Sequence, residues 1–97
     1  MDEKTLSKRL KALADPTRRH MIALIHQGEQ CGCELIHCLD VSQPTMSHHL
    51  KILSDAALIK GVKTKTRINY TVRYETIEAI HKALDTLLER PTIQCEE

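Results

Sequence analysis

Aromatic residues are nearly absent from this sequence of 97 residues, which contains two Tyr and neither Phe nor Trp. The core must therefore be built from Leu, Ile, Val, Ala and Met. A chain of this length is expected to form one domain, here residues 1–97. Because so short a chain buries only a modest fraction of its surface, pairing with a second copy would help its stability.

Three further features are missing. No apolar run approaches the roughly 20 residues that a membrane span requires. The first ten residues, MDEKTLSKRL, are charged and lack the apolar centre of a secretory signal. No glycine-rich phosphate loop or known catalytic signature occurs, so an enzyme is not expected. These absences favour a cytoplasmic protein without a membrane partner.

Charge is unevenly distributed along the chain, although the net charge is only +1. Residues 42–74 contain six basic side chains and one acidic side chain, whereas residues 75–97 contain two basic and six acidic ones. A basic middle third is typical of a surface that binds a polyanion. We interpret it as a nucleic-acid interface in preference to a solvated charged face.

The first half of the chain predicts helices. Leu6, Leu10 and Leu13 recur at helical spacing. Asp15 is a good N-cap and Pro16 fits the first position of a second helix. A short third helix is expected over residues 32–39. A turn at residues 40–42 then leads into a fourth helix that ends near residue 56, and this pair predicts a helix-turn-helix.

In the second half of the chain, the helical spacing of apolar residues gives way to a strand-like pattern. Residues 58–62 and 67–72 are rich in β-branched side chains and flank a polar stretch, which predicts a β-hairpin. A basic hairpin after a recognition helix is typical of a DNA-binding wing. A last helix over residues 74–89 has an apolar seam formed by Ile77, Ile80, Leu84 and Leu87.

Together these elements predict a mostly α-helical winged helix-turn-helix that forms a homodimer. We assign dimerisation to residues 1–14 and 74–90, because the last helix follows a core that is already complete. Residues 91–97 are expected to be a flexible tail.

The fourth helix has a predicted inner and outer face. Met46, Leu50 and Leu53 face the core, and His49 beside them is expected to pack or form hydrogen bonds. Candidates for contacts with base edges lie on the outer face: Gln43, Thr45, Ser47 and His48. Candidates for phosphate contacts are Lys51, Lys63, Lys65 and Arg67.

Four cysteines suggest a site for a soft ion. Without an export signal, clustered cysteines more often bind metal or react than form disulfides, and Cys31 and Cys33 are poor partners for an ordinary disulfide. Thiolates select thiophilic ions. We expect Cys31 and Cys33 to be ligands, with Cys95 or Cys38 as a third. Cys38 lies about 140° from Cys33 around a helix, and its neighbours also suggest a small core residue.

The segments LKALADPTRRHMIALI and CGCELIHCLDVSQPTMSHHLKIL, followed by the basic hairpin and the closing helix, resemble the ArsR/SmtB family of metal-responsive repressors. The resemblance covers about residues 6–88. It implies a homodimeric winged helix-turn-helix that represses its own operon and leaves operator DNA when an inducer binds. In the arsenic-responsive branch, the inducer motif is Cys-x-Cys-x-x-Cys at the start of the third helix. Cys31 and Cys33 match its first two positions, whereas Ile36 stands at the third.

The resemblance implies trivalent arsenic or antimony as the inducer, bound by three sulfurs. Cadmium, lead or zinc would also suit these thiols, with His37 as a further zinc ligand. Bonds to one ion would distort the start of the third helix, shift the fourth, and spoil its match to half-sites about one DNA turn apart. A thiol redox switch on the same fold is the alternative, with Cys31, Cys33 or Cys38 as the oxidised groups.

Overall fold

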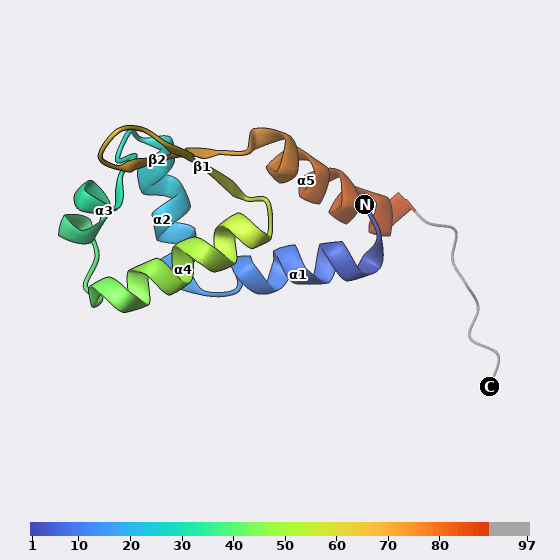
Figure 1. Cartoon of the computed structure of the whole chain (residues 1–97). Helices are drawn as coiled ribbons and strands as arrows, with labels where there is room; N and C mark the ends of the chain where they lie inside the picture. Colours follow the sequence, from blue (N-terminus) through green and yellow to red (C-terminus); the bar gives the residue numbers. More distant parts are fainter. Residues whose placement is uncertain (90–97) are drawn as a thin grey trace.

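The computed structural model describes residues 1–89, which form five helices and a two-stranded antiparallel hairpin (Figure 1). In chain order the elements are α1 (Glu3–Leu13), α2 (Pro16–His26), α3 (Gly32–Cys38), α4 (Gln43–Asp55), β1 (Ile59–Lys63), β2 (Ile68–Val72) and α5 (Tyr74–Glu89). The predicted order of elements is confirmed, and α3 ends one residue earlier than expected.

Side-chain caps set the starts of α2 and α4. The Asp15 carboxylate accepts hydrogen bonds from the backbone N–H groups of Thr17, at 2.7 Å, and Arg18, at 3.3 Å, and Pro16 follows as the first residue of α2. Burial raises the pKa of Asp15, but the N–H donors of Arg18 and Thr17 outweigh it, so the pKa lies below its ordinary value of 3.8. Ser42 caps α4 in the same way, because its hydroxyl oxygen accepts a hydrogen bond from the Thr45 N–H at 3.3 Å.

The core is aliphatic, as predicted from the scarcity of aromatic residues. Its buried side chains come from every helix and both strands and include Ala12, Met21, Ile25, Leu35, Met46, Leu50, Leu53, Leu58, Ile59, Val72 and Ile80. Three helices, α2, α3 and α4, meet in this core, so α3 is held against both α2 and α4. None of the helices in residues 1–89 is both long and apolar enough to cross a membrane.

The hairpin pairs β1 with β2 in register, with Ile59 opposite Val72 and Gly61 opposite Tyr70. A Cβ atom on Gly61 would lie 2.9 Å from Ile68 and 3.0 Å from the Tyr70 ring. Glycine is therefore required here for the Tyr70 ring to lie across β1. Residues 64–67 form the turn at the tip of the hairpin.

The helices α1 and α5 contact each other at the end of the molecule opposite α3 and the hairpin tip (Figure 1). In the predicted apolar seam of α5, Ile80 is buried in the chain's own core, whereas Leu84 and Leu87 are 43% and 52% exposed. Leu88 is 88% exposed and Leu10 of α1 is 38% exposed. An apolar surface therefore remains on these two helices after the core is complete.

Candidate nucleic-acid interface and thiol site

The recognition helix α4 separates its two faces as predicted. Met46, Leu50 and Leu53 are buried. The side chains proposed to contact DNA from this helix are all exposed: Gln43, Thr45, Ser47, His48 and Lys51. Polar side chains therefore line the outer face of α4.

His49 on the inner side of α4 has the hydrogen-bonding role expected of it. Its Nδ1 atom lies 3.1 Å from Nη1 of Arg18 on α2. A guanidinium has no acceptor, so Nδ1 accepts this hydrogen bond. Arg18 also donates to the carbonyl oxygens of Ala12, at 2.6 Å, and Lys11, at 3.2 Å. These bonds fix α4 to α2 and to the end of α1.

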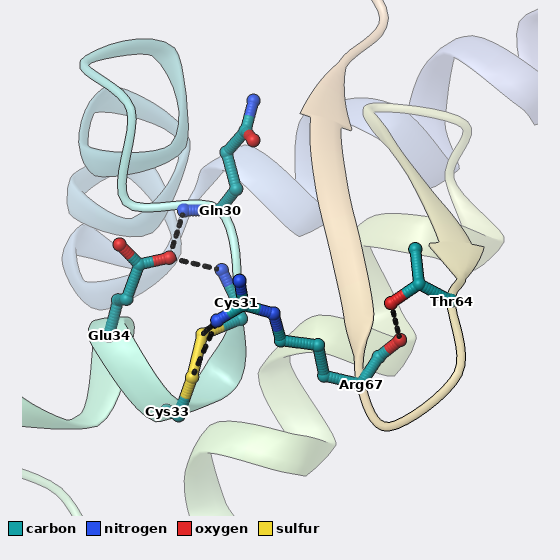
Figure 2. The surroundings of a disulfide bond; sticks show 6 residues. All are labelled: Gln30, Cys31, Cys33, Glu34, Thr64 and Arg67. Carbon is teal, nitrogen blue, oxygen red and sulfur yellow. Dashed lines mark hydrogen bonds between the residues drawn. A yellow bond between two sulfur atoms is a disulfide. The ribbon is translucent and has the colours of Figure 1, made fainter.

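The tip of the hairpin carries the other basic candidates. The Arg67 carbonyl oxygen accepts hydrogen bonds from the Thr64 N–H, at 2.8 Å, and the Thr64 hydroxyl, at 3.0 Å, which close the turn. Lys63, the last residue of β1, and Lys65, in this turn, are both exposed. Arg67, a further candidate for phosphate contact, extends its guanidinium toward the cysteine pair (Figure 2).

Cys31 and Cys33 are joined in a disulfide, with their Cα atoms 5.2 Å apart (Figure 2). The prediction that these two residues are poor disulfide partners was therefore wrong. Cys31 is the N-cap of α3 and has an extended backbone, whereas Cys33 already lies in the first turn of the helix. The chain bends between them, which brings the Cα separation into the usual disulfide range of about 4.4–6.8 Å. Cys31 is fully buried and Cys33 is exposed.

Two neighbouring side chains hold this segment. Glu34 Oε1 accepts hydrogen bonds from the backbone N–H groups of Gln30, at 3.2 Å, and Cys31, at 3.1 Å. From the other side, Nη1 of Arg67 lies 3.8 Å from the Cys31 sulfur and 3.9 Å from the Cys33 sulfur. The start of α3 is thus fixed by a carboxylate of its own helix and by a cation from the hairpin (Figure 2).

The backbone also joins the cysteine segment to the hairpin. The Tyr70 N–H donates to the Gln30 carbonyl oxygen at 2.7 Å, and Cys31 forms an antiparallel bridge with Asn69. Residues 30 and 31 therefore lie along β2 like a very short third strand. Sequence reasoning missed this contact, because two residues carry no strand periodicity that could be recognised.

Among the described residues, Cys38 is not grouped with the cysteine pair. Cys38 is a free, exposed thiol at the end of α3, so its interpretation as a small core residue was wrong. The inward side of this short helix is occupied by Leu35, which is fully buried, and the half-buried Leu39 that follows. Cys95 lies outside the described residues. Over residues 1–89, no three or more Cys, His, Asp or Glu side chains are grouped to hold a metal ion.

A groove of about 560 Å³ lies between α3, α4 and the hairpin. Both cysteines of the pair line it, and so does Ile36, the residue at the third position of the expected motif. Residues proposed to contact DNA also line it: Gln43, Ser47, Lys63, Lys65 and Arg67. The sulfur pair therefore faces the same groove as the recognition helix and the basic hairpin.

A helix-turn-helix followed by a basic antiparallel hairpin defines a winged helix-turn-helix, a class of DNA-binding domain. Residues 15–60 match the model of the arsR family of bacterial regulatory proteins. Together with the relatives described next, this match shows that the chain belongs to the ArsR family, which confirms the resemblance.

The chain is 38% identical over 87 residues to the arsenical resistance operon repressor of Staphylococcus xylosus, covering 90% of this chain and 84% of the relative. It is 34% identical to the repressor of the same description from Staphylococcus aureus, with the same coverage. An ArsR-like transcriptional regulator from a Rhodococcus species superposes with a TM-score of 0.79 over 87% of this chain and 79% of the other, at 24% identity. A homodimeric winged helix-turn-helix domain from Mycobacterium bovis gives a TM-score of 0.71 at 19% identity, covering 97% and 88%.

Proposed function

We propose that this chain is a transcriptional repressor that binds operator DNA as a homodimer and leaves it when trivalent arsenic or antimony binds Cys31 and Cys33. One observation carries the proposal: both sulfurs meet at the start of α3, in the groove between the recognition helix and the basic hairpin. The staphylococcal relatives, which are described as arsenical resistance operon repressors, support arsenic as the inducer.

The donor set suits such an ion. Trivalent arsenic and antimony are thiophilic, and sulfur ligands select ions of this kind. The disulfide must first be reduced to two thiols by a thiol reductant, which supplies two electrons and two protons. Each thiol then replaces one hydroxide of arsenous acid, and one water molecule is released for each sulfur bonded. Cys95 and Cys38 remain the candidates for a third sulfur.

The effect on DNA follows from the packing of α3 on α4. A Cβ atom on Gly32, between the two cysteines, would lie 3.3 Å from the Met46 side chain of α4. A change in the first turn of α3 therefore presses directly on the recognition helix. Because both recognition helices of a dimer must match their half-sites, a small displacement weakens binding. Release requires the inducer to favour the DNA-free form by a few kcal/mol.

The exposed apolar residues of α1 and α5 support the homodimer. Leu84, Leu87 and Leu88 lie together on the last turns of α5, and Leu10 lies on α1, which α5 contacts. In a C2 dimer the same patch of each subunit would cover its counterpart. The structural relative from Mycobacterium bovis is described as homodimeric.

The experiment that tests the proposal is fluorescence anisotropy of the reduced protein on its own upstream DNA. Arsenite, antimonite, cadmium, lead and zinc are titrated separately. Cys31→Ser/Cys33→Ser removes the pair, and Cys38→Ser tests whether Cys38 supplies the third sulfur. Release by arsenite or antimonite that is lost in the double variant supports the proposal, and weaker release in Cys38→Ser assigns the third sulfur to Cys38. Release that survives in the double variant would refute it.

The disulfide itself favours one second function, a thiol redox switch on the same DNA-binding fold. Hydrogen peroxide oxidises two thiols to a disulfide and is reduced to two water molecules. If this is the signal, peroxide releases the DNA, dithiothreitol restores binding, and arsenite has no effect. The same anisotropy assay separates the two functions.

A further inference from the structure

We propose that Arg67 is a positioning residue that transmits the state of the cysteine pair to the DNA-binding hairpin. This proposal rests on the proposed function for the identity of the inducer. Inducer binding would then affect DNA binding in two ways. It would displace α4 through α3, and it would also alter the hairpin through Arg67.

The first observation is the place of Arg67 between two parts of the molecule. Its guanidinium lies 3.8 and 3.9 Å from the two sulfurs, whereas its carbonyl oxygen accepts both hydrogen bonds that close the hairpin tip. One residue therefore touches the sulfur pair with its side chain and holds the turn with its backbone (Figure 2). A displacement of the side chain acts directly on the turn that presents Lys63 and Lys65.

The second observation is that the cysteine segment and β2 are bonded to each other. Tyr70 donates its N–H to the Gln30 carbonyl oxygen at 2.7 Å, and Cys31 bridges to Asn69. These contacts lie only a few residues from Arg67 along β2. The guanidinium contact and the backbone bridge together make the hairpin and the start of α3 one connected unit.

An ion that bonds to both sulfurs competes with this arrangement. The sulfur pair and Arg67 line the same groove, so an ion entering from the groove meets the guanidinium at the sulfurs. After the disulfide is reduced, a thiolate sulfur attracts the guanidinium through its negative charge, and bonding to the ion lowers this attraction because the charge is shared with the ion. Inducer binding therefore displaces Arg67, loosens the tip of the hairpin and weakens its contacts with DNA.

The test compares two variants that each remove one positive charge. Arg67→Gln loses the contact with the sulfurs, whereas Lys4→Gln, at the start of α1, is the control that leaves this contact and the hairpin in place. For each reduced protein, the release factor is the ratio of the DNA dissociation constants with and without saturating arsenite. We expect Arg67→Gln to lower the release factor about fivefold, the lower end of typical allosteric couplings. Lys4→Gln should leave it unchanged.

A second readout follows the hairpin directly in the absence of DNA. Amide hydrogen exchange of Thr64 and Tyr70 reports the two hydrogen bonds that hold the turn and β2. Arsenite should accelerate their exchange in the wild-type protein, and Arg67→Gln should accelerate it without arsenite. Arg67→Lys keeps the charge and should restore part of the release factor.

The outcomes separate the two proposals. If wild-type protein is released by arsenite but Arg67→Gln has the same release factor and the same amide exchange, the role of Arg67 is wrong and the proposed function stands. If arsenite neither binds the wild-type protein nor releases it from DNA, the proposed function fails. In that case the role of Arg67 is tested separately by amide exchange. If its contact with the sulfurs holds the turn, Arg67→Gln must still accelerate the exchange of Thr64. Unchanged exchange would overturn the role of Arg67 as well.

Discussion

Replacement of Lys65 by Gln should reveal how the hairpin contributes to DNA binding. Lys65 is exposed at the hairpin tip and, within the described part of the chain, forms no ion pair. Its ammonium group is therefore available to a phosphate. Because a contact between Lys and phosphate carries no sequence information, the substitution should weaken binding to all DNA sequences alike.

The magnitude follows from counterion release. Each phosphate contact contributes about 0.9 to the slope of log affinity against log salt, which corresponds to about eightfold in affinity at 0.1 M salt. A homodimer carries Lys65 twice, so Lys65→Gln should reduce the slope by about 1.8 and the affinity by about 60-fold. The free energy of unfolding should change by less than about 0.5 kcal/mol, since the side chain is on the surface.

The assay is fluorescence anisotropy at salt concentrations from about 50 to 300 mM, a range in which the slope is well determined. Lys4→Gln is the matched control, because it removes the same charge from the start of α1, at the other end of the molecule (Figure 1). Its slope should equal that of the wild-type protein. An unchanged slope for Lys65→Gln, or an equal decrease for both variants, would refute the assignment of the hairpin to the phosphate backbone.

Three further predictions concern other parts of the molecule. Asp15→Ala should lower the free energy of unfolding by about 1 kcal/mol at pH 7 through loss of the α2 cap. The pKa of Asp15 in the folded protein lies below 3.8. The difference between variant and wild type should therefore persist above pH 3.8 and vanish as the pH falls through the lowered pKa. Urea titrations at neutral and acidic pH check this, and a difference independent of pH would contradict it. Leu84→Glu/Leu87→Glu should yield monomers in sedimentation equilibrium, whereas an intact dimer would place the interface elsewhere. Thr45→Ala should change the order of affinity among operator variants without changing the salt slope, and a uniform loss in a competition assay would argue against base contact.

Much of the fold was predictable because its determinants are local. Asp15 and Ser42 cap helices through hydrogen bonds that span two or three residues, so the sequence motif and the structure coincide. The spacing of Met46, Leu50 and Leu53 identified the inner face of α4 for the same reason, since helical periodicity alone decides which side chains point the same way.

The geometry of the thiol site depended on contacts that no local pattern encodes. The pairing of Cys31 with Cys33 follows from the bend at the N-cap of α3, which the spacing of the cysteines does not specify. Arg67 lies 36 residues from Cys31 in the sequence, so no local spacing indicates that its guanidinium contacts the sulfurs. Cys38 appeared suited to the core, but Leu35 fills the inward side of a helix only seven residues long.

The most direct test of the central claim is reciprocal binding of arsenite and operator DNA. If arsenite weakens DNA binding by acting on Cys31 and Cys33, DNA must weaken arsenite binding by the same factor, because the two equilibria are thermodynamically linked. The measurement is the arsenite dissociation constant of the reduced protein, obtained by equilibrium dialysis with and without saturating operator DNA. We expect a larger dissociation constant with DNA, by the factor found in anisotropy, and no measurable arsenite binding to Cys31→Ser/Cys33→Ser. Arsenite binding of equal strength with and without DNA would contradict the account.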